Sequence, residues 1–461
     1  MRKFITTLKN IYHIEELRQK ILYTLGIILI FRVGSYIALP GIDVRLLSET
    51  TFSSNSREGL LGLLDMFSGG AFSNASIFAL GIMPYISASI VVQLLMLVIP
   101  YFQRLQKEGE SGRKKINQIT RFLTIFVTVI QAPAYITNLV SQVGTNSGIF
   151  HTIHGDPIVG GSLPASFMAV SMLVLVSSTL FIMWLGERIT DKGIGNGISL
   201  LIMIGIIARL PFALGAEFTS KMAESGNGGL VTFMIEILVL IAVILVCILL
   251  VQGTRRVPVQ YAKRIVGNRQ YGGQRNYLPI KVNAAGVMPI IFAQAIMFLP
   301  LTIMGFSNNT ESMGVLAAAL TNNNGFWYNV VYAIMIIMFT YFYTAITFNP
   351  QQIADEMKKN GGFIPGVKPG KKTVEFIDNI ISRVTLPGSI FLAFVAIMPA
   401  FARLFGINQQ FAQFFGGTSL LIMVGVILDT LQQIESHLKM RHYDGLTRSG
   451  HIKGRSPLPT M

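Results

Sequence analysis

The sequence is poor in charge and has almost no cysteine. Only 13% of its 461 residues are charged, whereas 51% are hydrophobic. So low a charged fraction excludes an ordinary soluble domain and predicts an integral membrane protein. The one cysteine, Cys247, lies within an apolar run, which excludes an internal disulfide framework and a multi-thiolate metal site.

Recognisable catalytic motifs are missing as well. No Ser-His-Asp, HExxH or Walker-type pattern is evident, and the six histidines lie outside the apolar runs or at their ends. We therefore predict no enzyme, no metal site and no cofactor. Among ionisable residues in the apolar runs, Arg32 lies deep, while Glu187, Glu236 and Asp429 lie near ends. This scarcity disfavours an ion-coupled transporter, and Arg32 is expected to pair across a helix interface.

Apolar runs long enough to cross a membrane as helices dominate the chain. There are ten, at residues 21–40, 77–99, 121–141, 165–186, 194–213, 231–252, 284–305, 328–348, 384–402 and 414–434. Because five is odd, two sets of five spans enter the membrane in opposite senses. The predicted fold is an all-α membrane protein with ten transmembrane helices in two inverted five-helix halves, residues 21–213 and 214–434.

Lys and Arg are distributed unevenly between the connecting segments. Of the 37 basic residues, 31 lie in residues 1–20, 101–121, 187–193, 253–283, 349–383 and 435–461, which alternate along the chain with basic-poor loops. The positive-inside rule places these segments, including both termini, in the cytoplasm. Residues 1–20 then form an amphipathic segment on the membrane surface, and residues 435–461 a basic cytoplasmic tail.

Two of the basic loops have features of fixed shape. Residues 253–283 mix basic residues with Tyr and contain the pair Gly272-Gly273, which predicts a β-hairpin with its turn there. The loop 349–383 opens with Asn349-Pro350, a helix N-cap followed by proline at the first helical position. Both loops are predicted to be docking surfaces for an acidic partner.

A broken apolar stretch near the N-terminus suggests an enclosed space. Residues 60–67 are apolar but too short to span, and Ser68-Gly69-Gly70 interrupts them before the run 77–99. A re-entrant half-helix of this kind survives at membrane depth only beside protein or a water-filled cavity. The alternative is an ordinary loop carrying an apolar helix.

Several spans carry isoleucine pairs at helical spacing. Ile82 and Ile86 are four residues apart, as are Ile198 and Ile202, so each pair shares one helix face. Lipid contact is the commoner explanation of such pairs, and a role in a pore is the alternative. Polar residues on neighbouring positions argue that these spans do not face lipid all round: Ser87, Ser89, Gln93, Asn283 and Gln294.

Long motifs, in order along the chain, resemble the SecY family of protein-conducting channels. They are FSGGAFSNASIFALGIMPYISASI (67–90), WLGERITDKGIGNGISL (184–200), YAKR (261–264), LPIKVNAAGVMPIIFA (278–293), FNPQQIADEMKKNGGFIPGVKPG (348–370) and FGGTSLLIMVGVILD (415–429). Strings of this length are far more specific than short catalytic motifs.

The resemblance implies roles for individual residues. Residues 60–74 would be the plug, with Leu60, Leu61, Leu63, Leu64, Met66, Phe67, Ser68, Gly69 and Gly70. The pore ring would consist of Ile82, Ile86, Ile198, Ile202, Ile291 and Ile422. The lateral gate would include Ser87, Gln93 and Gln294. Docking of the motor ATPase SecA and of the ribosome would use Arg255, Arg256, Lys263, Arg264 and Lys368. Lys368 stands where bacterial relatives typically carry Arg, which keeps the charge but loses the bidentate fork.

The resemblance also implies the setting. The chain would be the central pore subunit of a protein translocase in the bacterial plasma (inner) membrane, with small SecE-like and SecG-like membrane subunits as partners. It would pass secretory and membrane preproteins across the lipid bilayer, or release their apolar segments into it. The alternative function is secondary transport of a small solute, which the inverted topology and the broken helix would also suit.

Overall fold

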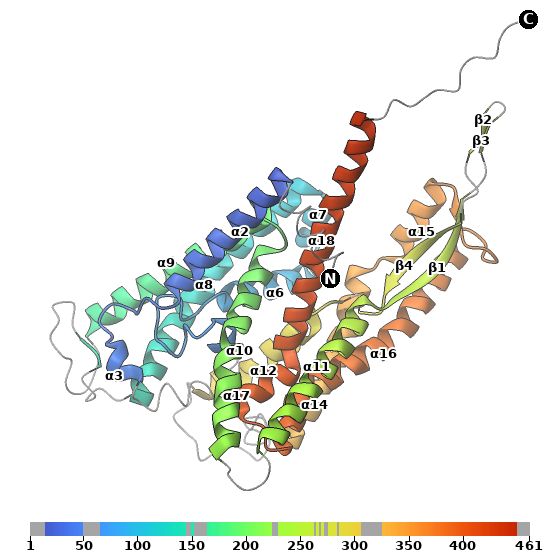
Figure 1. The fold of residues 1–461 in the computed structure, drawn as a ribbon. Helices are drawn as coiled ribbons and strands as arrows, with labels where there is room; N and C mark the ends of the chain where they lie inside the picture. The colour runs from blue at the N-terminus through green and yellow to red at the C-terminus, as the bar shows by residue number, and fades with distance from the viewer. Residues whose placement is uncertain are drawn as a thin grey trace, which may run out of the picture.

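The computed structural model describes residues 14–48, 65–143, 149–151, 164–223, 229–261, 264–266, 269–271, 275–283, 285–305 and 325–449. Within them, ten helices of 16 or more residues lie over the ten predicted spans (Figure 1). These are α2 (Glu15–Gly34), α6 (Met83–Val98), α8 (Glu110–Val143), α9 (Ala165–Lys192), α10 (Gly197–Ala223), α11 (Gly229–Gln252), α12 (Met288–Gly305), α14 (Phe326–Thr347), α16 (Lys371–Leu404) and α18 (Gly417–Ser449). Helices satisfy their own backbone polar groups, which apolar surroundings require.

Not all ten helices are equally apolar. Seven of the described helices are long and apolar enough to cross a membrane, or eight if α6 and α7 (Pro100–Lys107), which meet at 101°, form one span. α2 is not among them because Glu15, Glu16, Arg18, Lys20 and Arg32 interrupt its apolar residues. At the other extreme, none of the 18 residues of α12 is charged.

Several helices extend beyond the predicted spans. α2 begins at Glu15 rather than 21, α16 begins at Lys371 rather than 384, and α18 continues to Ser449. Charged Lys, Arg and Glu are good helix formers, so a helix does not end where its apolar run ends. The predicted tail 435–461 is therefore partly a continuation of α18, and the predicted surface segment 1–20 is described only from residue 14.

The predicted span 77–99 is wrong at its start. Residues 77–82 form turns, and the helix begins at Met83. The backbone N–H of Ile77 donates to the carbonyl oxygen of Ile37 at 2.8 Å, and Ala38 forms a bridge with Ser76. These contacts with the chain beyond α2 take the place of helical hydrogen bonds.

The two basic loops form one unit, which we call the hairpin module. β1 (Thr254–Tyr261) pairs antiparallel with β4 (Arg275–Lys281) on one side and with β5 (Gly362–Phe363) on the other. Val257, Ile280, Met357 and Ile377 are buried beneath this sheet, against α15 (Pro350–Lys359) and the start of α16. The predicted hairpin is thus confirmed, and the second loop contributes a strand to it.

The predicted position of the hairpin turn is wrong. β2 (Arg264–Val266) pairs with β3 (Arg269–Tyr271) so that Val266 lies opposite Arg269, and the chain therefore reverses between these two residues. Gly272-Gly273 follows the reversal, outside the described residues. The predicted N-cap is confirmed: the Asn349 side chain accepts hydrogen bonds from the N–H groups of Gln351 and Gln352.

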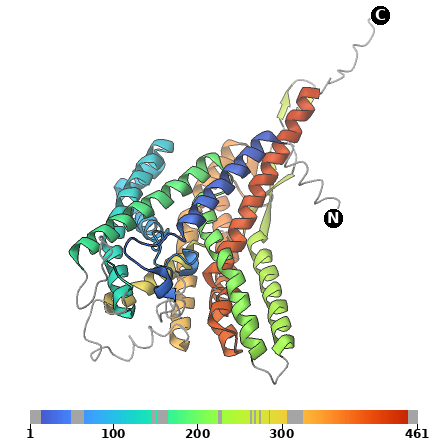
Figure 2. The same ribbon diagram turned by 60° about the vertical axis from the view of Figure 1, so that its left-hand side comes forward.

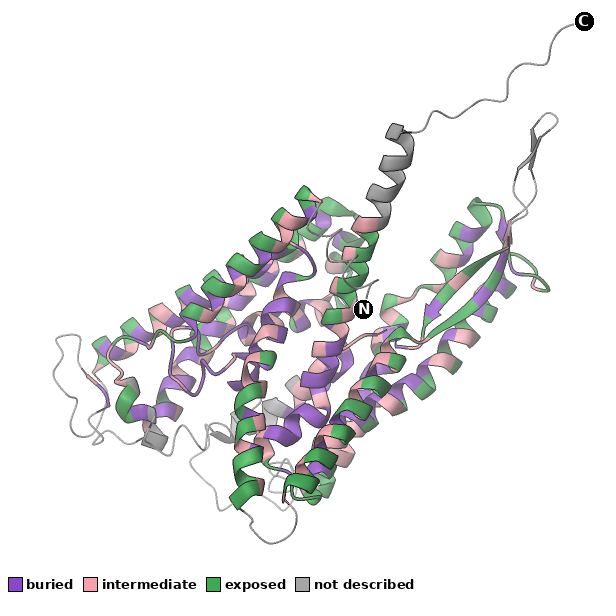
Figure 3. Ribbon diagram, in the orientation of Figure 1, coloured by how far each residue is buried: buried purple, intermediate pink, exposed green. Residues whose placement is uncertain are grey.

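Burial follows the bundle. Figure 3 shows buried residues on the inward faces of the helices and exposed residues on the outward faces. Large apolar side chains such as Leu245, Leu249 and Phe394 lie exposed on those outward faces, as expected of helices surrounded by lipid. α2 lies beside α9 and α10 (Figure 2), and the end of α18 projects in the same direction as the hairpin module (Figure 1).

Candidate functional site

Residues 65–82, which we call the central segment, run through the middle of the first five helices. Residues 65–67 form one helical turn, and residues 68–82 form turns as far as the start of α6. Met66, Ala71 and Phe78 are buried in one cluster with side chains of α2, α9, α10 and α17 (Gln409–Ala412). The Tyr135 hydroxyl on α8 donates to the carbonyl oxygen of Phe72 at 2.9 Å. A segment without regular structure is therefore held in a fixed place by its surroundings.

A pair of glycines allows the central segment to lie against α10. A Cβ atom on Gly205 of α10 would stand 2.6 Å from the carbonyl oxygen of Phe67, which is closer than such atoms approach. A Cβ on Gly69 would stand 3.0 Å from the Cα of Gly205, and Gly69 has a φ of 67°, where side chains are strained. This contact therefore requires glycine on both sides.

Two arginines hold the same segment. On α2, Arg32 donates from Nη1 to the carbonyl oxygen of Gly69 at 3.0 Å and from Nη2 to the Tyr36 hydroxyl at 3.0 Å. On α10, Arg209 forms an ion pair with the buried Asp65. The prediction that Arg32 pairs across a helix interface is wrong in its partner, because Arg32 binds a backbone carbonyl of the non-helical central segment and the hydroxyl of Tyr36, just beyond its own helix.

A polar cavity lies over the central segment. It has a volume of about 220 Å³ and is lined by both arginines, Asp65 and residues of α17 and η2 (Gln413–Phe415). α17 lies at the end of the bundle opposite the hairpin module (Figure 1). A space beside the broken stretch, as the sequence predicts, is thus present at this end.

The six predicted ring isoleucines belong to one extended apolar cluster. Ile82, Ile202 and Ile422 belong to the buried cluster that contains Met66 and Phe67, and the other three pack against it: Ile86, Ile198 and Ile291. They come from α6, α10, α12 and α18 and from the end of the central segment. Val287, Met203 and Met423 join the same cluster, although no sequence pattern singled them out. The central segment and the predicted ring isoleucines therefore share one apolar cluster.

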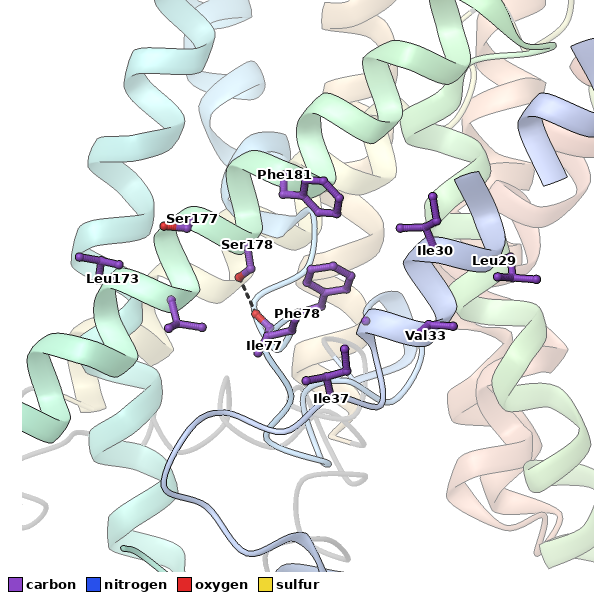
Figure 4. A pocket seen from close by; sticks show the side chains of 12 residues that line it. Leu29, Ile30, Val33, Ile37, Ile77, Phe78, Leu173, Ser177, Ser178 and Phe181 are labelled. Carbon is purple, nitrogen blue, oxygen red and sulfur yellow. Dashed lines mark hydrogen bonds between the residues drawn. The ribbon is translucent and has the colours of Figure 1, made fainter. Parts of the chain in front are cut away.

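An open apolar groove lies between α2 and α9. Its volume is about 640 Å³, and Ile77 and Phe78 of the central segment form part of its lining (Figure 4). The Ser178 hydroxyl on α9 donates to the carbonyl oxygen of Ile77, and Phe78 stacks on Phe181 with ring centroids 6.3 Å apart. The central segment is thus fixed to α9 on one side and to α10 on the other.

The predicted gate residues lie on α6 and α12. Ser87, Gln93 and Gln294 are all half-buried. Side chains of the two helices share a second buried cluster, which includes Ile90 and Phe292. The Gln93 Oε1 atom is buried and has no hydrogen-bond partner among the described residues. α6 and α12 therefore contribute to one apolar cluster, and the side-chain carbonyl of Gln93 on α6 is buried and unsatisfied among the described residues.

The predicted docking residues lie on the hairpin module. Arg255 and Arg256 are exposed on β1, and Lys368 is exposed in the turn between β5 and α16. Arg264 begins β2, whereas Lys263 lies outside the described residues. Because β5 pairs with β1, the structure joins two predicted surfaces into one rigid surface.

Part of the predicted plug cannot be placed. Leu60, Leu61, Leu63 and Leu64 lie outside the described residues, whereas Met66, Phe67, Ser68, Gly69 and Gly70 belong to the central segment. Sequence reasoning missed Asp65, Arg209 and Gly205. The sequence shows Arg209 near the end of a span and Asp65 shortly before Gly69-Gly70. Neither position indicates which residue it pairs with.

Within the described ranges, no group of three or more His, Cys, Asp or Glu side chains could hold a metal ion. The site consists of an apolar cluster, a segment that covers it and polar anchors for that segment.

Comparisons with known proteins agree on one family. A family model described as SecY matches residues 76–431. The chain is 43% identical over 449 residues to the protein translocase subunit SecY of Streptomyces coelicolor, covering 96% of this chain and 100% of that relative. Two solved structures match with 17% identity over 95% of each chain. One is of a protein-conducting channel, with a TM-score of 0.64, and the other is of a SecY protein with its plug domain, with a TM-score of 0.62. This chain belongs to the SecY family.

Proposed function

We propose that this chain is the central pore subunit of a protein translocase, which passes unfolded secretory polypeptides across the membrane. The observation that carries the proposal is that the central segment and all six isoleucines share one apolar cluster. One of the similar structures is described as a SecY protein whose plug domain stabilises the closed state of the translocation channel and maintains a membrane seal. In this chain, residues 60–74 act as the plug and the isoleucines act as the pore ring.

The ring is suited to a polypeptide rather than to an ion. Ile82, Ile202 and Ile422 offer branched apolar side chains and no hydrogen-bonding group. An ion crosses such a dry constriction poorly, while the side chains part around an extended chain without binding it. The relatives are named as translocase subunits and channels, which supports this function over small-solute transport.

The α6–α12 seam serves as the lateral gate. Both helices contribute apolar side chains to one cluster, so a segment of about 20 apolar residues passes between them and leaves for lipid. Gln93 and Gln294 keep the seam from being uniformly apolar. Polar stretches gain nothing by entering lipid and continue across the membrane.

The driving force comes from partners, since the chain itself catalyses no reaction. The exposed basic residues of the hairpin module dock SecA and the ribosome, and phosphate contacts in the ribosomal RNA make the second interaction sensitive to salt. SecE-like and SecG-like subunits complete the complex. The excess of Lys and Arg supports a cytoplasmic position for the hairpin module and both termini, and the bacterial relatives support a bacterial plasma membrane as the site.

Site-specific photo-crosslinking tests this function. A photoreactive residue is placed at Ile86 or Ile291 in membranes that carry a secretory chain arrested halfway. We expect crosslinks to the arrested chain at both positions, and none when its signal sequence is deleted. Leu249, exposed on the outward face of α11, is the matched control position and should give no crosslink to a secretory chain. Translocation without a crosslink at either isoleucine would refute the proposal.

A further inference from the structure

Arg209 and Asp65 form a compact network inside the plug region. The Nη2 atom of Arg209 donates to Asp65 and, at 2.7 Å, to the Ser73 hydroxyl. Asp65 Oδ1 accepts the backbone N–H of Ser73 at 2.8 Å, and the Asp65 carbonyl accepts the N–H of Gly70 at 2.8 Å. Both ends of the 65–73 turn are therefore tied to one guanidinium on α10.

The two charges are buried to different degrees. The Asp65 side chain is 4% exposed, and that of Arg209 is 17% exposed, toward the polar cavity. A buried carboxylate that loses its partner is left as an uncompensated charge, whereas replacing both partners together removes the problem. Arg209 can instead gain water from the cavity beside it.

Arg209 uses only some of its N–H donors in this network. Both hydrogen bonds that Arg209 donates to the plug region come from Nη2, while Nε lies over Gly70, buried and without a hydrogen-bond partner among the described residues. Because Asp65 and Ser73 are held by the same nitrogen, both hydrogen bonds are lost together when the segment moves away from α10. This suits a contact that opens and re-forms rather than a permanent structural tie.

We propose that the Arg209–Asp65 pair is a latch that sets how readily the plug leaves the pore, and hence how strong a signal sequence must be to open it. This rests on the proposed function. When the plug is displaced, both charges enter water and the pair no longer favours the closed state. Arg209 and Asp65 are thus specificity-determining residues, although neither contacts the ring.

The test uses the purified complex in planar lipid bilayers, together with transport of a preprotein that has a defective signal sequence. We expect Arg209→Gln to raise the resting ion conductance on the order of tenfold, because it leaves Asp65 buried and charged. Asp65→Asn should have a smaller effect, since Arg209 faces the cavity. The double variant should recover most of the seal, and Arg209→Lys, which retains the charge, should leak less than Arg209→Gln. Transport of the defective preprotein should follow the same order.

Controls separate the latch from folding and from the proposed function. Arg121 on α8 forms a two-point ion pair with Glu187 on α9, with contacts of 2.9 and 2.6 Å, and Arg121→Gln should leave the conductance unchanged. Deletion of residues 60–72 should leak more than any point variant. If Arg209→Gln and Asp65→Asn seal like the parent while the deletion leaks, the latch is wrong and the plug stands. If the deletion also seals, the proposed function fails.

Discussion

Arginines in the plug region and arginines on the hairpin module are used in opposite ways. Arg32 and Arg209 point inward and hold a segment of their own chain. Arg255 and Arg256 lie on β1, both exposed to solvent. The charge of an arginine alone therefore does not reveal its function. An arginine with an internal partner stabilises one state of the channel, whereas an exposed arginine is available to bind another molecule.

The strongest way to break this comparison is to reverse the exposed charges. Replacement of Arg255, Arg256 and Lys368 by Glu should reduce SecA-driven transport by roughly a hundredfold or more, because attraction to the partner becomes repulsion. The resting ion conductance should not change. Transport of a preprotein into vesicles and bilayer conductance are measured on the same preparation.

A matched variant distinguishes position from total charge. Arg113, Lys114 and Lys115 are exposed on α8, outside the module, and their replacement by Glu changes the net charge equally. Transport should fall much less. Equal loss in both triple variants would show that bulk electrostatics, and not the module surface, recruits the partner.

A second substitution tests the contact between the plug region and α10, and its expected effect is smaller. Gly205→Ala places a methyl group against the carbonyl oxygen of Phe67 and should displace the plug, raising resting conductance several-fold while SecA binding is retained. On the same helix, a Cβ on Gly215 would meet nothing within 4 Å. Gly215→Ala should therefore seal normally and gain up to about 1 kcal/mol of helix stability. A tight Gly205→Ala channel would contradict the close contact.

The smallest effect concerns the module itself. Asn349→Ala removes the side chain that caps α15 and should cost about 1 kcal/mol of local stability. β5, which follows α15, still pairs with β1 and keeps the helix in place. Transport should therefore fall less than about twofold. Hydrogen exchange over α15 measures the loss. The variant Asn349→Asp, which keeps a capping oxygen, should exchange like the parent.

Local patterns predicted much of the fold. The apolar runs located all ten long helices, and Asn349-Pro350 located the start of α15, because both signals act within a few residues. The start of α6 escaped prediction. Residues 77–82 are apolar like the helix that follows, but their backbone pairs with residue 37, and apolarity does not report such a contact.

The site was predicted in its composition but not in its pairings. The ring isoleucines came from the family resemblance, and all six belong to one extended apolar cluster, while their role as a ring stays a prediction. The partners that are distant in sequence were missed: Asp65 with Arg209, Gly69 with Gly205, and β1 with β5. A single sequence gives the chemistry of each residue and not which residue it meets.

The pairing of β5 with β1 has a mechanical consequence. The turn that carries Lys368 leads at once into α16, whose 34 residues run unbroken from the module to Leu404, about 50 Å at 1.5 Å per residue. A partner pulling on the module therefore acts on a lever arm that reaches through the membrane. Pro387 and Pro399 within α16 are the two places where this arm can flex, so they set where a force applied in the cytoplasm is felt.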